Sequence, residues 1–402
     1  MKMEEWKECK LGEYLYIKGR IGWKGLKKDE YLKESPYRII NGESLTEKGI
    51  EWSKAGFITK DRYDESPEIM LEINDILLSK DGTIGKIGFV KELLSPTTVA
   101  SGIFVIRNIN PEIIDTMFIY HFLRSSKFKN FIKMRTEGSV IPHLYQKDFE
   151  ELDFPIPPLP TQQKIAVILS SLGDKIELNN KINTNLEQQA QALFKNWFVD
   201  KYEKQGTIGD YCAVKSGFAF KSAWWQDEGT KVIRIGDIEQ GCLNLETCAH
   251  VATDKIEVAK DFIVQGGDLV IAMTGATIGK FSMIPKTQEP ILVNQRVGKF
   301  FLGNNPLEKV PFIYCTLKQE EVITEFINRG QGSAQPNIST GDILSIPCWI
   351  PSKNEIDNFN KTSQPMFETI ISNQEENRKL SDLRDSLLPK LMNGEIETEK
   401  LF

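Results

Sequence analysis

The chain has 402 residues, with 50 Lys+Arg against 56 Asp+Glu and a formal net charge of -6. Hydrophobic residues make up 40% and charged residues 26%, which is the composition of an ordinary globular protein and excludes a disordered or fibrous one. The acidic balance argues against a strongly basic protein that coats DNA, because nonspecific affinity for phosphate comes from many Lys and Arg contacts. A net negative charge is still compatible with local basic surfaces.

No run of residues approaches the roughly 20 apolar residues that span a bilayer, and the first residues lack the apolar core of a signal peptide. We therefore expect a cytoplasmic protein. The six cysteines are scattered and include no CxxC pair. Neither a metal cluster nor a disulfide is expected from such spacing in a reducing compartment.

The chain repeats itself at an offset of 194 residues, since Thr83-Ile84-Gly85-Lys86 recurs as Thr277-Ile278-Gly279-Lys280. Further matches at this offset join Phe118-Ile119-Tyr120 to Phe312-Ile313-Tyr314, Gly138-Ser139-x-x-Pro142 to Gly332-Ser333-x-x-Pro336, and Asp148 to Asp342. Two copies of one plan therefore fill the chain.

The first part of each copy, residues 1–157 and 205–350, is rich in Gly, aromatic and β-branched residues. Short apolar runs such as 75–79 and 268–272 are bounded by turn residues, which predicts short strands. Helical patterns interrupt these runs near residues 115–135 and 309–329. Both parts are thus predicted to be globular α+β domains.

The second part of each copy, residues 158–204 and 351–402, has few glycines and carries a heptad pattern. Two stripes hold Ile165, Leu172, Asn179, Leu186, Leu193 and Leu169, Ile176, Asn183, Ala190, Trp197 in the first copy, and Phe359, Met366, Asn373, Leu380, Leu387 and Ser363, Ile370, Asn377, Arg384, Leu391 in the second. The predicted fold is therefore α+β, with two globular domains separated by two long antiparallel coiled-coil helices and an internal pseudo-two-fold repeat.

Local signals refine the two helices. Ser352 and Glu355 have the spacing of a capping box, which predicts the start of the second helix. Gly173 and Pro365 lie near the same repeat position and are helix breakers, so we expect a short lead-in turn before each long helix.

Four asparagines, Asn179, Asn183, Asn373 and Asn377, occupy heptad positions that are otherwise apolar. A polar residue there costs stability but selects helix register and partner orientation. One hypothesis is that these asparagines meet across an antiparallel helix pair. The other is that they face solvent.

Catalytic motifs are missing from the sequence. Gly275-Ala-Thr-Ile-Gly279-Lys280 resembles a phosphate loop, but the glycines enclose three residues rather than four and Phe281 follows the lysine. We expect this loop to approach another backbone closely and to present Lys86 and Lys280 outward. The three histidines, His121, His143 and His250, have no partners at metal-ligand spacing. The sequence predicts a binding protein without its own catalysis.

Two similar modules held by long helices suit a ligand with two separated half-sites, and DNA is the natural case. Arg reads guanine, while Asn and Gln read adenine. The side chains that we predict to contact DNA are Arg20, Lys24, Lys80, Thr83, Lys86, Arg135, Ser139 and His143 in the first copy, and Arg234, Thr277, Lys280, Asn294, Gln295, Arg296, Arg329, Gln331, Ser333, Gln335 and Asn337 in the second.

Two alternatives stay open at this point. Polar loops of this kind are often simply solvated turns, and a coiled-coil scaffold whose globular ends bind other proteins would suit the net acidity. A self-sufficient methyltransferase is disfavoured, because the chain lacks an (Asn/Asp)-Pro-Pro-(Tyr/Phe) motif and a glycine-rich cofactor loop.

The arrangement resembles the specificity subunit of a type I restriction-modification system over nearly all 402 residues. The resemblance is carried by the Thr-Ile-Gly-Lys and Gly-Ser-x-x-Pro loops in both copies, by the junction Pro157-Pro158-Leu159-Pro160-x-Gln162-Gln163-x-Ile165, and by the ending Leu383-Arg384-Asp385-Ser386-Leu387-Leu388-Pro389-Lys390-Leu391-Met392-Asn393-Gly394-Glu395-Ile396.

The resemblance implies that residues 1–157 and 205–350 are two target-recognition domains, each of which reads one half of a bipartite asymmetric site in double-stranded DNA. Residues 158–204 and 351–402 would then be a central and a C-terminal spacer helix that set the gap between the halves. It also implies two modification subunits, which methylate adenine with S-adenosylmethionine, and restriction subunits, which use ATP and Mg for cleavage. These cofactors would belong to the partners and none to this chain.

Two departures from the family pattern stand out. The second junction, at 351–355, lacks the Pro-Pro and Gln-Gln features, so partner contacts there can differ. The Asn294-Gln295 pair has Ala100-Ser101 as its counterpart. The role of a residue in one domain therefore cannot be copied to the other.

Overall fold

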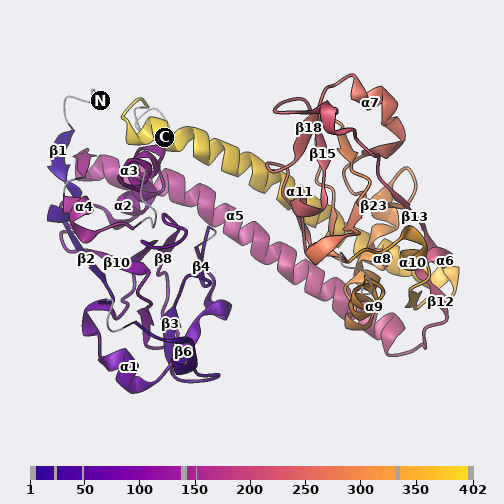
Figure 1. Cartoon of the computed structure of the whole chain (residues 1–402), viewed down its shortest axis with the longest axis horizontal. Coiled ribbons are helices and arrows are strands. Elements are labelled where there is room, and N and C mark those ends of the chain that lie inside the picture. Colours follow the sequence, from indigo (N-terminus) through magenta and orange to yellow (C-terminus); the bar gives the residue numbers. More distant parts are fainter. Residues whose placement is uncertain are drawn as a thin grey trace. The chain divides into compact units, whose positions relative to one another are not determined.

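The computed structural model describes residues 6–21, 25–47, 49–136, 143–150, 152–330 and 336–396. The chain divides into two compact units, which we call unit 1 and unit 2 (Figure 1). Unit 1 combines Met1–Asp174 with Ser381–Phe402, and unit 2 is Lys175–Leu380.

Unit 1 is built on a four-stranded antiparallel sheet in the order β2-β10-β7-β8 and a three-stranded sheet in the order β6-β3-β9, in which β3 and β9 are parallel. Its strands are β1 (Lys7–Lys10), β2 (Leu15–Gly19), β3 (Tyr37–Ile40), β4 (Leu45–Thr46), β5 (Gly49–Ile50), β6 (Gly56–Ile58), β7 (Ile76–Ser79), β8 (Ile87–Phe89), β9 (Thr97–Val99), β10 (Ile103–Asn108) and β11 (Asp153–Ile156). Its short helices are α1 (Lys60–Asp64), α2 (Thr116–Leu123), α3 (Ser126–Thr136) and α4 (Gln146–Glu150).

Unit 2 repeats this plan with a four-stranded sheet in the order β13-β23-β20-β21 and a five-stranded sheet in the order β14-β18-β15-β22-β19. Its strands are β12 (Gly206–Thr207), β13 (Ala213–Ser216), β14 (Trp225–Gln226), β15 (Thr230–Ile233), β16 (Ile238–Glu239), β17 (Cys242–Leu243), β18 (Ala249–Val251), β19 (Ile263–Val264), β20 (Leu269–Ala272), β21 (Phe281–Met283), β22 (Ile291–Val293), β23 (Val297–Phe301) and β24 (Pro347–Cys348). Its short helices are α6 (Ile208–Tyr211), α7 (Lys255–Val258), α8 (Val310–Leu317), α9 (Glu320–Gly330) and α10 (Thr340–Leu344).

The topology confirms the repeat and the α+β fold class. The parallel pair β3–β9 of unit 1 returns as β15–β22, and the antiparallel pair β1–β11, which joins the two ends of the first domain, returns as β12–β24. The predicted strands at 75–79 and 268–272 are β7 and β20. The predicted helical regions are the pairs α2–α3 and α8–α9.

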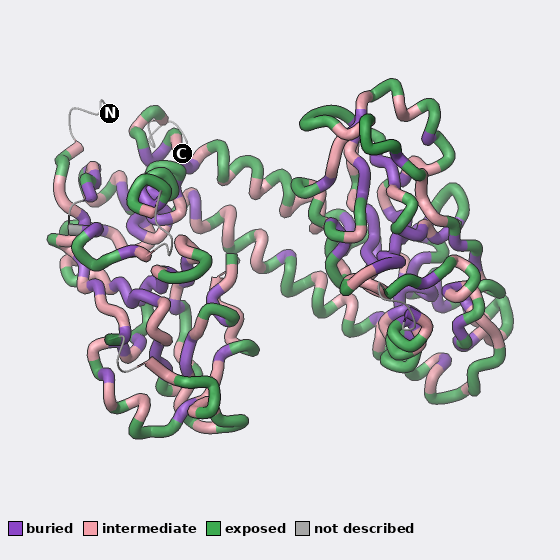
Figure 2. Tube along the Cα trace, in the orientation of Figure 1, coloured by how far each residue is buried: buried purple, intermediate pink, exposed green. Residues whose placement is uncertain are grey.

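Two long helices complete both units: α5 (Leu159–Phe194), followed by a π turn over Lys195–Val199, and α11 (Lys353–Met392). Unit 1 buries the start of α5 and the end of α11 against α2 and the four-stranded sheet, through residues such as Leu169 and Leu391. Unit 2 buries the end of α5 and the start of α11 in the same way, through Phe194 and Phe359. Figure 2 shows this buried interior along the strands of each unit.

The heptad prediction is confirmed, because every residue of the two stripes is buried or half-buried in both helices. The predicted capping box is also present: the backbone N–H of Ser352 donates to Glu355 Oε2 over 3.1 Å, and α11 begins at the next residue.

The expected lead-in turns are wrong, since α5 runs through Gly173 and α11 through Pro365 without interruption. A helical glycine costs only about 1 kcal/mol relative to alanine. Proline removes one backbone hydrogen bond, but Ser363 and Phe367 on either side of it are fully buried. Packing of the flanking turns thus outweighs both local penalties.

The asparagine hypothesis is confirmed within unit 2. Asn179 Nδ2 donates to Asn377 Oδ1 over 2.9 Å, and Asn373 Nδ2 donates to Asn183 Oδ1 over 2.8 Å. As residue numbers rise along α5 they fall along α11, so the two helices are antiparallel here. Adding the repeat offset to the α5 residue of one contact gives the α11 residue of the other contact. Two contacts related in this way indicate a local pseudo-two-fold axis. Among the described residues, no helix has both the length and the apolar character to cross a membrane.

Candidate nucleic-acid interface

Each unit carries a tight turn between the parallel strand of one sheet and the central strand of the other. In unit 2 the turn holds Asn294, Gln295 and Arg296: the N–H of Asn294 donates to the carbonyl of Ile233, and its own carbonyl accepts from Val297 over 2.9 Å. Asn294 Oδ1 accepts from the N–H of Arg296 over 3.2 Å, so this side chain braces the turn. Gln295 and Arg296 are exposed.

Unit 1 has the same turn with different side chains. The N–H of Ala100 donates to the carbonyl of Ile40 over 2.8 Å, and the N–H of Ile103 donates to the carbonyl of Ala100 over 3.2 Å. The residues at the turn are Ala100, Ser101 and Gly102, which offer no long side chain.

A second shared feature joins this turn to the segment that leads into α10 or α4. In unit 2 the residue after β20, Met273, donates its N–H to the carbonyl of Arg296 and accepts from the N–H of Ile338, over 3.0 and 2.9 Å. In unit 1 Lys80 donates to Gly102 and accepts from Leu144, over 2.8 and 3.1 Å. The next residue forms a β-bridge in both cases: Thr274 with Asn337, and Asp81 with His143.

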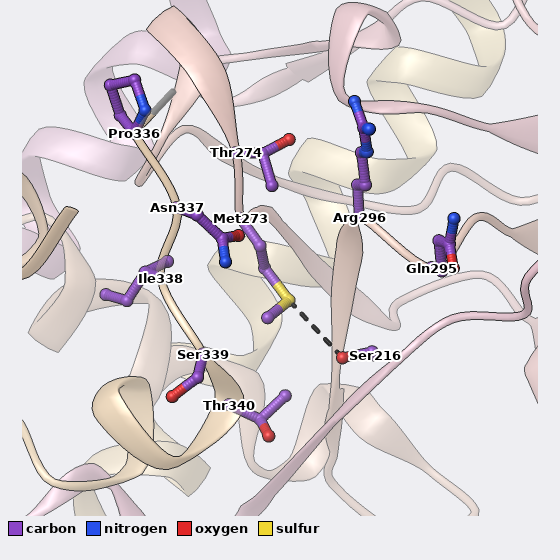
Figure 3. A pocket seen from close by; sticks show the side chains of 10 residues that line it. All are labelled: Ser216, Met273, Thr274, Gln295, Arg296, Pro336, Asn337, Ile338, Ser339 and Thr340. Atoms are coloured by element: carbon purple, nitrogen blue, oxygen red, sulfur yellow. Dashed lines mark hydrogen bonds between the residues drawn. The ribbon is translucent and has the colours of Figure 1, made fainter. Parts of the chain in front are cut away.

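In unit 2 these segments surround an open pocket of about 620 Å³ (Figure 3). Its lining residues are Ser216, Met273, Thr274, Gln295, Arg296, Pro336, Asn337, Ile338, Ser339 and Thr340. Thr274 is 9% exposed, and its buried Oγ1 has no hydrogen-bond partner among the described residues. Figure 3 shows Asn337 and Met273 projecting into one space from opposite segments, with Arg296 and Gln295 extending from the turn. The pocket thus gathers predicted residues from separate loops.

The matching position of unit 1 is occupied by a hydrogen-bonded carboxylate and imidazole. His143 Nδ1 bonds to Asp81 Oδ1, and the imidazole packs edge-on against Tyr145 at 4.4 Å between ring centroids. Lys80 lies beside them with its Nζ 4.9 Å from the centroid of Phe104, and burial lowers the pKa of Lys80. The shared backbone therefore presents a different set of polar atoms in each unit.

The Thr-Ile-Gly-Lys loops follow this bridge. Gly85 and Gly279 have φ of 97° and 79°, which favours glycine, and both loops turn back to the next strand. Thr83 is exposed and accepts from Ser79 Oγ through its carbonyl, whereas Thr277 donates its hydroxyl to the carbonyl of Thr274.

The two lysines of these loops, Lys86 and Lys280, are half-buried. Lys86 Nζ donates to the carbonyl of Gly42 over 3.2 Å. Lys86 thus contacts another loop through its ammonium group, and the expectation that both lysines are presented outward stays a prediction.

Two predicted arginines are structural instead. Arg20 is 1% exposed; its Nε donates to the carbonyl of Val99 over 3.1 Å, and its remaining nitrogens face Ser66 and Thr98. A side chain enclosed in this way does not reach the surface, so the prediction that Arg20 contacts DNA is not supported. Arg329 Nε bonds to Glu325 over 3.0 Å, and Nη1 donates to the carbonyl of Asp342 over 2.8 Å.

The guanidinium of Arg329 is thus bonded to the end of α10. The prediction that Arg329 contacts DNA is not supported. Arg234 is exposed, and its Nη2 donates to the carbonyl of Thr247 over 3.0 Å. Arg135 lies 3.7 Å from Asp148 and over the ring of Phe131. Predicted residues that lie outside the described part of the chain are Lys24, Ser139, Gln331, Ser333 and Gln335.

Sequence reasoning missed Asp81, Ser216 and Gln162. Asp81 aligns with Thr274 only after a one-residue shift between the copies is allowed for, so a fixed offset hides it. Gln162 belongs to the Pro-Pro junction, yet it is fully buried and holds α2: its Oε1 accepts from the N–H of Asp115 over 2.9 Å and its Nε2 donates to two carbonyls. A glutamine in the first turn of a helix gives no signal of such a role.

The chain matches the family model of the type I restriction modification DNA specificity domain twice, over residues 3–188 and 201–382. The chain belongs to this family. DNA recognition is the general role of the family. The double match also agrees with the internal repeat.

Relatives match over most of their length. A similar protein, the type I restriction enzyme MjaVIII specificity subunit of Methanocaldococcus jannaschii, is 27% identical over 99% of this chain and 94% of its own. The HindI specificity subunit of Haemophilus influenzae is 26% identical over 74% of this chain and 81% of its own. The crystal structure of a type I restriction-modification S subunit from M. genitalium shares the fold, with a TM-score of 0.54, 19% identity and 96% coverage of both chains.

The side chains at the candidate interface are suited to hydrogen bonding. Among the described residues, no group of three or more His, Cys, Asp or Glu side chains is arranged to hold a metal ion. The candidate interface holds amides, hydroxyls, a guanidinium and a carboxylate, and groups of these kinds hydrogen-bond to the edges of bases in protein–DNA complexes.

Proposed function

We propose that this chain is the sequence-reading subunit of a type I restriction-modification complex and that each unit reads one half of a bipartite asymmetric DNA site. The observation that supports this most strongly is the pair of matched frames: the same turn and bridge occur in both units, but with different polar side chains. Identical frames would serve one kind of ligand twice, and different side chains would select different sequences.

Salt dependence of binding tests the DNA proposal against a protein-binding scaffold. DNA binding releases counterions, so the logarithm of affinity falls steeply and linearly with the logarithm of salt concentration. We expect such a slope for the assembled protein with one duplex sequence and much weaker binding to scrambled duplexes. Equal binding to all duplexes, or a flat salt dependence, would favour the scaffold.

We further propose that two modification subunits bind one chain, because the pseudo-two-fold relation of α5 and α11 offers nearly the same helical surface twice. These partners would supply S-adenosylmethionine chemistry, and restriction subunits would supply ATP- and Mg-dependent cleavage; this chain would hold none of these cofactors. Native mass measurement of the reconstituted complex is expected to give two modification subunits per chain. A stable 1:1 complex at saturating partner would rule this out.

A further inference from the structure

The matched frames allow the two units to be compared residue by residue at one position. The position is the β-bridge together with the neighbouring turn: Asp81, His143 and Gly102 in unit 1, and Thr274, Asn337 and Arg296 in unit 2. A Cβ placed on Gly102 would lie 3.5 Å from Asp81 Cβ, so turn and bridge touch in unit 1. In unit 2 both segments line the same pocket.

Unit 1 presents hydrogen-bond acceptors here. Asp81 Oδ1 is a carboxylate oxygen and can only accept, so the facing His143 Nδ1 is the donor of this hydrogen bond. Asp81 Oδ2 makes no hydrogen bond to any described residue, and 42% of the Asp81 side chain is exposed. This bridge therefore offers one carboxylate oxygen, Asp81 Oδ2, as an acceptor that no described residue occupies.

Unit 2 presents mainly donors at the same position. Arg296 carries five N–H donors in a planar fork, and its exposed side chain makes no hydrogen bond within the described ranges. Asn337 and Gln295 add amide groups, and Thr274 adds a buried hydroxyl without a described partner. The residue equivalent to Arg296 in unit 1 is glycine, which has no side-chain donor. The two units therefore differ in the number of hydrogen-bond donors that this turn can present.

Two other arginines predicted to read bases make extensive internal contacts. Arg20 is enclosed by Val99, Ser66 and Thr98, and Arg329 holds the end of α10. At the bridge and turn, by contrast, Asp81 and Arg296 are exposed on segments whose backbone hydrogen bonds recur in both units.

We infer that these positions determine which bases the two half-sites contain. Asp81, with His143 held against it, recognises a base that presents an exocyclic amino group in the major groove, which is cytosine or adenine. Arg296 recognises the acceptor edge of guanine. This inference rests on the proposed function and assigns to named residues the selectivity that the proposed function requires.

Selection of DNA from a random duplex pool, by the full chain assembled with its modification subunit, tests these assignments. Asp81→Asn keeps the size of the side chain and replaces a free acceptor by an amide. We expect the preferred base to change at a single position of one half-site, with the other half-site unchanged. Arg296→Ala is expected to lower discrimination for one guanine of the other half-site by about 10- to 100-fold.

Matched controls separate this effect from charge and folding. Asp153→Asn removes an exposed carboxylate of unit 1 that pairs with Lys10 over 2.5 Å, and Lys260→Ala removes an exposed cation of unit 2 that pairs with Glu257 over 2.9 Å. Both controls should leave the selected sequence unchanged. If Asp81→Asn lowers the melting temperature, His143→Asn provides a second test, because asparagine already occupies the equivalent bridge position in unit 2.

The outcomes distinguish the inference from the proposed function. A two-part sequence selected by the wild-type protein, but unaltered by the folded Asp81, His143 and Arg296 variants, would overturn the inference alone. If the Asp81→Asn and Arg296→Ala variants alter the same half-site, the inference fails together with the proposal that each unit reads one half. A wild-type protein that selects no two-part sequence would overturn the proposed function as well.

Discussion

His121 is a buried histidine that makes stability depend on pH. It is 5% exposed in unit 1, where its Nε2 lies 3.0 Å from Ser170 Oγ. Burial lowers the pKa of His121 from 6.5 to about 3, with Arg124 and Arg384 contributing in the same direction. The unfolded chain therefore binds a proton at His121 below about pH 6.5, whereas the folded chain binds it only near pH 3.

This difference predicts that the contribution of His121 to the free energy of unfolding is fully present above about pH 6.5. The contribution is lost as the pH decreases from there toward 3. Between about pH 7 and pH 5 the contribution lost is about 2 kcal/mol. Urea unfolding of the wild-type chain and of His121→Gln at both pH values measures it, and the variant should show a smaller decrease. His250→Gln, which alters a partly exposed histidine, is the control; an equal decrease in wild type and His121→Gln would contradict the account.

The arginines show what sequence reasoning could not decide at this scale. Arg20 and Arg329 are cationic side chains near polar loops, as is Arg296, and nothing in the local sequence separates them. The difference lies in the fold: distant segments at 66 and 98–99 enclose Arg20, and the end of α10 receives Arg329. The sequence singles out Asn294 beside Gln295, but only the turn geometry shows that Asn294 braces the turn.

The helix pair in unit 2 depends on Asn179. This side chain is fully buried, and its Nδ2 donates to Glu376 Oε2 over 2.7 Å and to Asn377 Oδ1 over 2.9 Å. Lys175 lies 3.3 Å from Glu376 and extends the cluster. Removing the amide takes a donor from two acceptors on α11, of which Glu376 Oε2 keeps Lys175 and Asn377 Oδ1 loses its partner on α5.

Asn179→Ala is therefore expected to lower the free energy of unfolding by about 1–3 kcal/mol. Asn185→Ala is the matched control, because Asn185 is exposed on the same helix and bonds only to Gln189 among the described residues. The comparison cancels the higher helix propensity of alanine. Equal melting temperatures for the two variants would show that the buried asparagine contributes nothing.

At the scale of elements, a periodic pattern of apolar residues is enough to predict a long helix. A single glycine or proline is a misleading sign of a break in it. The heptad stripes and the Ser352–Glu355 cap predict α5 and α11, because burial repeats over many turns and a cap is a local contact. Gly173 and Pro365 predict breaks because helix propensity describes a residue alone and takes no account of how the neighbouring turns pack. The energy that holds α11 through Pro365 comes from packing on either side of it, at Ser363 and Phe367.

The internal repeat makes the whole-molecule organisation predictable. A single offset of 194 residues relates the two globular parts, their helical regions and the two long helices, all of which can be placed from the amino-acid sequence alone. The offset does not show which helix segments each globular part buries. Both α5 and α11 contribute to both units, so the division into compact units cuts both helices rather than following the predicted domain boundaries.

Helix length is expected to set the gap between the two half-sites. Adding seven residues at equivalent positions of α5 and α11 keeps the heptad phase and lengthens each helix by about 10.5 Å. At roughly 3.4 Å per base pair, the gap should grow by about 3 base pairs while both half-sites stay the same. Sequencing of the methylated DNA measures the gap. An unchanged gap in a stable variant would show that the helices do not set it.

Exchange of one recognition domain tests most directly whether each domain reads one half-site. Residues 205–350 are replaced by the corresponding part of the HindI specificity subunit, and DNA is selected from a random pool with the assembled complex. One half-site is predicted to change completely, while the other half-site and the gap stay as in wild type. A change in both half-sites, or in neither, would contradict the claim that each domain reads one half.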